Sequence, residues 1–168
     1  LIKKRLTKKL KIQSTLLFLL GAMQGAIGWW MVKSGLVDDP YVSPYRLTFH
    51  LTNAVIMYSL LLWTSIEYYY LTSIRFIYFK TKEFLILLSI LLVFITILSG
   101  GFMAGSHAGQ SFNTYPLMNG KIIPDDIYFD NLGILNIFEN TVTINFNHRF
   151  RRTVCEWLKS RTPTTAEN

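Results

Sequence analysis

The sequence is poor in charged residues and in cysteine. Asp, Glu, Lys and Arg make up 16% of its 168 residues, against roughly 25% in an ordinary soluble domain, while hydrophobic residues make up 51%. This composition favours a protein embedded in lipid. The single cysteine, Cys155, excludes an internal disulfide and any zinc or iron–sulfur site built from cysteines.

Motifs of several enzyme classes are also absent from the sequence. It contains no glycine-rich phosphate-binding loop, no nucleophile elbow and no His-Glu-x-x-His metal pair. The net charge of +7 does not indicate a nucleic-acid partner, because the basic residues cluster between apolar runs instead of lining one soluble face. We therefore expect no binding to nucleic acid.

Three apolar runs are long enough to cross a bilayer, since about 20 helical residues span its ~30 Å hydrocarbon core. They cover about residues 14–33, 46–67 and 84–106, and the third has no charged side chain between Leu85 and Leu98. The sequence therefore predicts an all-α membrane protein, built as a transmembrane helix bundle in contact with membrane lipid.

The remaining segments are a basic tail over 1–13, a polar loop over 108–137 and the start of a fourth helix over 138–150. Five basic residues lie between Arg149 and Arg161, and each charge at mid-membrane costs roughly 2.5–3.5 kcal/mol. We therefore expect that the fourth helix does not span the membrane completely. We interpret 151–168 as an atypical, truncated or frameshifted tail.

The distribution of charge predicts the orientation of the chain in the membrane. The amino-terminal tail and the loop between Arg75 and Lys82 carry nine Lys and Arg, whereas the two opposite loops carry three, together with five aspartates. By the positive-inside rule, the amino terminus is expected in the cytoplasm and the 108–137 loop outside.

His50 is the first candidate functional residue, about one turn inside the second run. Asn53 and Ala54 share its helical face, and a polar stripe with a small residue suits a flat, bulky ligand. An ionisable residue inside a span is costly and often functional. A histidine hydrogen-bonded to a neighbouring helix would explain the same pattern.

His148 is the second candidate, and a polar helix end near lipid headgroups is its alternative interpretation. Two histidines on separate helices, both in the outer half of the membrane, suit porphyrin iron, which membrane proteins commonly hold by imidazoles from facing helices. His107 follows the third run in a loop, where we expect a surface histidine and not a ligand.

The glycine spacing and Glu139 each allow two interpretations. Gly21 and Gly25 stand four residues apart, as do Gly101, Gly105 and Gly109. Such stripes of small residues let two helices approach closely, or let a flat macrocycle lie against one helix. We expect them to serve helix packing.

Glu139 is the one carboxylate inside a predicted helix away from basic flanks. We favour a glutamate stabilised by the helix dipole over an acid–base group.

Four motifs carry a resemblance to a known family. They are Met23-Gln-Gly-Ala-Ile-Gly-Trp-Trp, Val42-Ser-Pro-Tyr-Arg-Leu-Thr-Phe-His, Ala104-Gly-Ser-His-Ala-Gly with the following Asn113-Thr-Tyr-Pro-Leu-Met-Asn-Gly, and Phe138-Glu-Asn with Asn145-Phe-Asn-His-Arg. In this order they resemble the third to sixth helices of the heme A synthases, and together they cover about residues 13–150.

The resemblance implies an eight-helix fold of two four-helix halves, of which this chain holds the central helices. It implies that His50 and His148 are axial ligands of heme iron, with heme b as cofactor and heme O as substrate. The implied reaction oxidises a methyl group of heme O to the formyl group of heme A with oxygen from water. The implied location is the cell inner membrane.

The family's helices one, two, seven and eight have no counterpart in this sequence. The resemblance places the partner histidines of His50 and His148 on these helices. It also places there a glutamate beside the partner of His50, so the catalytic residue stays unassigned. We expect this chain alone to make no heme A, and the other helices to come from a separate chain or a homo-oligomer. A non-catalytic heme-binding membrane protein and a cytochrome oxidase assembly partner remain as alternatives.

Overall fold

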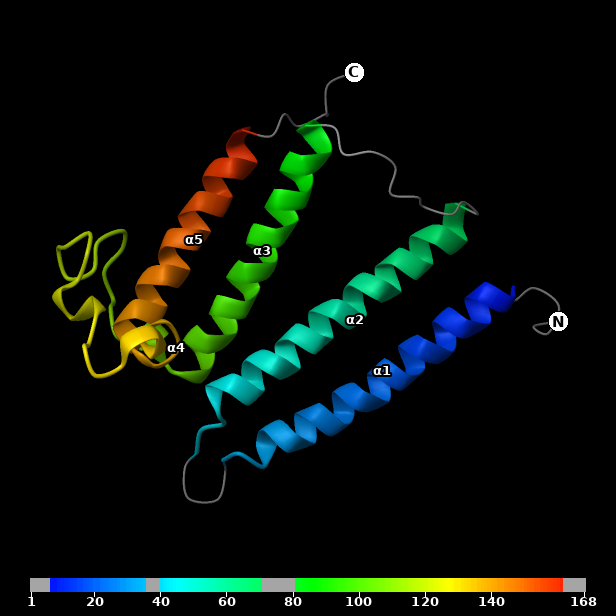
Figure 1. Ribbon diagram of the computed structural model, residues 1–168, viewed down its shortest axis with the longest axis horizontal. Helices are drawn as coiled ribbons and strands as arrows, with labels where there is room; N and C mark the ends of the chain where they lie inside the picture. Colours follow the sequence, from blue (N-terminus) through cyan, green and yellow to red (C-terminus); the bar gives the residue numbers. More distant parts are fainter. Residues whose placement is uncertain (1–6, 36–39, 71–80, 162–168) are drawn as a thin grey trace. The chain divides into compact units, whose positions relative to one another are not determined.

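The computed structural model describes residues 7–35, 40–70 and 81–161, and this part of the chain is helical. Its β-structure is limited to an isolated bridge between Met118 and Lys121, which confirms the all-α prediction. The long helices are α1 (Lys8–Val32), α2 (Pro44–Tyr70), α3 (Thr81–Gly105) and α5 (Thr141–Arg161); the short ones are η2 (Ala108–Gln110), η3 (Asp125–Ile127), η4 (Gly133–Leu135) and α4 (Asn136–Glu139) (Figure 1).

Three of the described helices are long and apolar enough to cross a membrane: α1, α2 and the part of α3 from Phe84. Their apolar side chains stay largely outside the protein core, as Phe18 at 75% exposure illustrates. Apolar patches of this extent are not found on soluble monomers, whereas lipid tails accommodate them. The chain is therefore a helical membrane protein.

The chain forms two compact units, and the first consists of Leu1–Val42 with Phe49–Tyr78. Its helices α1 and α2 run antiparallel: the start of α1 contacts the end of α2, and the end of α1 contacts the start of α2. Glu67 near the end of α2 forms an ion pair with Lys9 near the start of α1 and accepts a hydrogen bond from Gln13 Nε2 at 2.9 Å. Near the other end, the rings of Trp30 and Phe49 meet edge to face at 6.2 Å.

The second unit consists of Ser43–Thr48 with Phe79–Asn168, and its helices α3 and α5 are also antiparallel. Cys155 Sγ lies 3.4 Å from Thr96 Oγ1, and Asn145 Nδ2 donates to the Ala108 carbonyl at 2.6 Å. Asn145 is fully buried. A buried amide needs a partner, so this bond ties α5 to the turn that follows α3.

Asparagines hold the long loop against the start of α5. Asn136 accepts a hydrogen bond from the Phe129 amide at 2.9 Å and donates to the Phe129 carbonyl at 2.8 Å. Asn140 caps α5 by accepting from the Val142 amide at 2.9 Å, as asparagine does at helix N-termini. The same side chain donates to the Asp126 carbonyl at 3.0 Å, so the loop and the helix start share one polar core.

Arg149 binds the same loop from the side of α5. Its guanidinium donates to the Thr114 carbonyl at 2.6 Å and to the Phe112 carbonyl at 2.8 Å. The charged side chain next to His148 in the sequence is therefore engaged by carbonyl groups of the loop. The helix itself continues past this point to Arg161.

Glycine in α3 allows the start of α2 to approach closely. A Cβ added at Gly105 would lie 2.6 Å from Pro44 Cα, and one at Gly101 would lie 2.9 Å from Thr48 Oγ1. The first contact is with backbone, which cannot rotate away. The glycine stripe of the third apolar run therefore serves packing, as predicted.

We predict that Gly105→Ala destabilises the chain by about 1–3 kcal/mol, the usual cost of overpacking a well-packed site. Gly109→Ala is the control, because its Cβ would meet only the flexible end of Met103 at 3.4 Å. Thermal unfolding in detergent micelles, followed by circular dichroism, measures the difference. Equal melting temperatures for the two variants would contradict the close contact.

Candidate functional site

His50 lies on the face of α2 that contacts α1. A Cβ added at Gly28 would lie 3.0 Å from His50 Cε1, so the imidazole rests against the backbone of α1 where only glycine leaves room. Asn53, one turn further along α2, is 9% exposed. The helical spacing predicted that these two side chains share a face.

Three polar side chains form a network at this contact. Gln24 Nε2 on α1 lies 3.1 Å from the carbonyl oxygen of His50 and 3.3 Å from His50 Nε2, while Asn53 Nδ2 donates to Gln24 Oε1 at 2.6 Å. A carbonyl oxygen only accepts, so the Gln24 atom beside it is the amide nitrogen. The amide nitrogen also faces the ring, and His50 Nε2 is therefore the acceptor and Nδ1 carries the proton.

His148 lies where α5 meets α3, and its ring also rests on a glycine. A Cβ added at Gly100 would lie 3.3 Å from His148 Cε1. Ser99 Oγ lies 2.8 Å from His148 Nδ1 and 3.0 Å from the Thr96 carbonyl. When the Ser99 hydroxyl donates to this carbonyl, its oxygen is left to accept from the ring. In that arrangement Nδ1 of His148 is the donor to Ser99.

In this arrangement of hydrogen bonds, both imidazoles carry their proton on Nδ1, and Nε2 is the unprotonated nitrogen. This is the neutral tautomer that binds metals through Nε2, with Nδ1–H available to an acceptor that orients the ring. Ser99 is that acceptor at His148. At His50, Nδ1 is buried and has no hydrogen-bond partner among the described residues.

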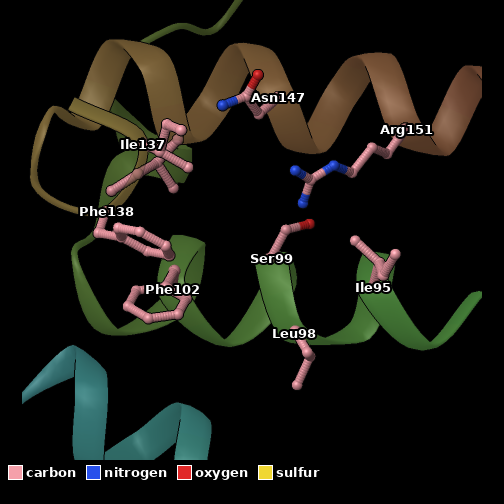
Figure 2. Close-up of a pocket in the computed structure, with 9 residues that line it drawn as sticks. Ile95, Leu98, Ser99, Phe102, Ile137, Phe138, Asn147 and Arg151 are labelled. Carbon is pink, nitrogen blue, oxygen red and sulfur yellow. The ribbon is translucent and has the colours of Figure 1, made fainter. Parts of the chain in front are cut away.

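A pocket of about 240 Å³ opens on one flank of the contact between α3 and α5. Figure 2 shows Ser99 on α3 pointing toward α5, and the guanidinium of Arg151 on α5 pointing toward Ser99. Phe102 and Phe138 lie against each other at the other end, with ring centroids 5.3 Å apart. The pocket suits an apolar group that carries an acidic substituent. Its remaining lining residues are Ile95, Leu98, Ile137, Ile144 and Asn147.

The other candidate residues lie apart from these contacts. His107 follows α3 in the left-handed conformation, with φ 55°, and precedes η2. Glu139 is the last residue of α4, not part of α5, and its exposed carboxylate accepts a hydrogen bond from the Tyr45 hydroxyl at 3.0 Å. The predicted position of Glu139 within the fourth long helix is therefore wrong. Asn140 has an extended backbone and separates α4 from α5.

Sequence reasoning missed the residues that support the two rings. Gln24 and Gly28 on α1, and Ser99 and Gly100 on α3, were not singled out. Gly28 lies three residues after Gly25, about one turn further along the same helical face, and this was an available signal. For Gly21 and Gly25 themselves, no atom of the described chain lies within 4 Å of an added Cβ, so the packing expected there is not formed within this part of the chain.

Each histidine is a single donor, because the described residues contain no group of three or more His, Cys, Asp or Glu side chains that could hold a metal ion. A porphyrin supplies four nitrogen ligands of its own and needs only axial donors from the protein. Neutral imidazoles that rest on glycine and present Nε2 therefore fit an iron porphyrin.

A family model described as cytochrome oxidase assembly protein, COX15-CtaA, matches residues 1–155. The chain belongs to the COX15-CtaA family. Among curated relatives, the heme A synthase of Nitrosospira multiformis is 41% identical over 96% of this chain, and that of Wolbachia pipientis wMel is 40% identical over 88%. Heme A synthase COX15 of Arabidopsis thaliana is 42% identical over 88% of the chain.

This COX15-CtaA family member spans less than half the length of these relatives: 48%, 43% and 35% in the same order. No solved structure matches it. The family match confirms the resemblance found in the sequence.

We predict that Gly28→Ala moves the His50 ring, since the added methyl group would lie within 3.0 Å of Cε1. Gly25→Ala is the matched control on the same helix, because no described atom lies within 4 Å of its Cβ. NMR chemical shifts of the labelled His50 ring in detergent micelles measure the movement. A shift of equal size in both variants would argue against the ring lying on Gly28.

Proposed function

We propose that this chain acts in heme A biosynthesis and contributes one axial ligand, His50 or His148, to each of two iron-porphyrin sites. The observation that supports this most directly is the shared state of the two rings: each rests on a glycine and presents Nε2 as a base. The family and its heme A synthase relatives supply the reaction class.

The proposed reaction oxidises a methyl group of heme O to the formyl group of heme A, with oxygen from water. It releases four electrons, which an acceptor outside this chain has to take up, and four protons. Bound heme b would supply the redox chemistry. The protein's own residues bind and orient: Ser99 accepts the Nδ1–H bond of His148, which fixes the ring and raises the basicity of Nε2. Arg151, directed into the pocket in Figure 2, would provide a cation for a porphyrin propionate.

We further propose that the second axial ligand of each site comes from helices other than those in these 168 residues. Imidazoles of facing helices commonly complete such sites, and this chain covers less than half of its relatives.

The cell inner membrane, with the amino terminus in the cytoplasm, is the proposed location. The clustering of basic residues at 1–13 and 75–82 supports this orientation.

We predict that the purified chain binds hemin and that His50→Ala and His148→Ala each weaken binding at one site by roughly tenfold or more. The reason is that loss of the imidazole removes an iron ligand. His107→Ala is the matched control and should bind like the unmodified chain. Titration followed by the Soret band, with a reduced-minus-oxidised spectrum, measures the effect. If all three variants bind alike, neither histidine is a ligand.

We predict that the chain expressed alone in a bacterial strain lacking heme A synthase makes no heme A, because the facing ligands and a catalytic carboxylate are not supplied. Co-expression with a chain carrying the relatives' remaining helices should restore production, and His148→Ala should abolish it again. Extraction and chromatography of cellular hemes provide the measurement. Heme A from the chain alone would refute this expectation, and heme binding without restored production would favour a non-catalytic heme-binding protein.

A further inference from the structure

The amide nitrogen of Gln24 lies within hydrogen-bond distance of His50 Nε2, the atom through which this ring would bind a metal. The nitrogen of this amide lies 3.3 Å from His50 Nε2. We propose that Gln24 is a positioning residue for His50: it selects the tautomer with a free Nε2 lone pair, caps that lone pair in the ligand-free chain and is displaced when iron binds. This inference rests on the proposed function, in which His50 ligates a porphyrin iron.

The orientation of the Gln24 amide is determined by the backbone carbonyl of His50. The nitrogen end contacts the His50 carbonyl, an obligate acceptor, at 3.1 Å, and the oxygen end accepts from Asn53 Nδ2 at 2.6 Å. A flipped Gln24 amide would put two oxygens together at the His50 carbonyl. This contact therefore requires the orientation that presents a donor to the ring, and the Asn53 amide is oriented to match it.

The tautomer of His50 is decided at Nε2. Nδ1 is buried without a partner among the described residues, so it gains no hydrogen bond in either neutral tautomer. A hydrogen on Nε2 would face the Gln24 donor and lose the contact there. One net hydrogen bond corresponds to a population ratio of roughly two- to tenfold, which favours the ring with a proton on Nδ1.

The two histidine sites therefore differ in what a ligand must displace. At His148, the described hydrogen bond is at Nδ1, to Ser99, and a metal bound at Nε2 leaves it intact. At His50, the described hydrogen bond is at Nε2, to Gln24, and a metal bound there has to break it. Binding at His50 is thus in competition with an internal group, whereas the described part of the chain places no such group at His148 Nε2.

The first test measures the tautomer without any porphyrin. In the full chain, with ¹⁵N-labelled histidine in detergent micelles, we expect His50 with its hydrogen on Nδ1. Gln24→Glu has nearly the same shape but places only acceptors before the ring, so Nε2 should gain a hydrogen. Gln13→Leu is the control, since this other α1 glutamine bonds to α2 at Glu67, away from His50. A wild-type ring with its hydrogen on Nε2, or one unchanged by Gln24→Glu, overturns the proposal.

The second test measures hemin affinity at His50 in a His148→Ala background, so that one site is observed. Gln24→Leu removes the cap at similar volume and should tighten hemin binding about two- to tenfold. Gln24→Glu should weaken it by roughly tenfold or more. Opposite effects of two substitutions at one position are not expected from a general loss of packing. Weaker binding in both variants overturns the displacement step.

The two tests separate this inference from the function on which it rests. If hemin binding does not depend on His50 at all, the proposed ligand role fails, while the tautomer measurement still reports whether Gln24 controls the ring. If binding depends on His50 but neither Gln24 substitution changes the tautomer or the affinity, the ligand role stands and the role of Gln24 is refuted.

Discussion

Hydrogen bonding to the two imidazoles is the constraint on which the rest of this structure depends. Between apolar helices there is little water, so a polar side chain has to find its partner on a neighbouring helix. Gln24 and Ser99 are those partners: Gln24 contacts Nε2 of His50, and Ser99 contacts Nδ1 of His148. The bonds that join the helices therefore also determine the chemistry that each ring can perform.

Close backbone approach is the second requirement, and both compact units meet it in the same way. The ring of His50 lies against Gly28, and the ring of His148 lies against Gly100. In each case a histidine on one helix rests on a glycine of the antiparallel neighbour. The two compact units therefore share this arrangement, without obvious sequence similarity between them.

The polar loop between α3 and α5 depends on amide side chains. Asn136, Asn140 and Asn145 are all nearly or fully buried, and each bonds to backbone groups of the loop or of the turn after α3. Asparagine serves here because one side chain can both donate and accept. The loop thereby fixes where α5 begins, and the start of α5 sets the position of His148 along α3.

The sequence by itself determined the membrane spans, because hydropathy is a local property of each run. It also identified His50 and His148 as candidates, through their helical positions and the family motifs. It did not find Gln24, Ser99 or the two glycines under the rings, and it placed Glu139 in the wrong helix. Only the tertiary structure decided these features, since the face that one helix presents to another, and hence which nitrogen of a ring is bonded, depends on contacts between residues far apart in the chain.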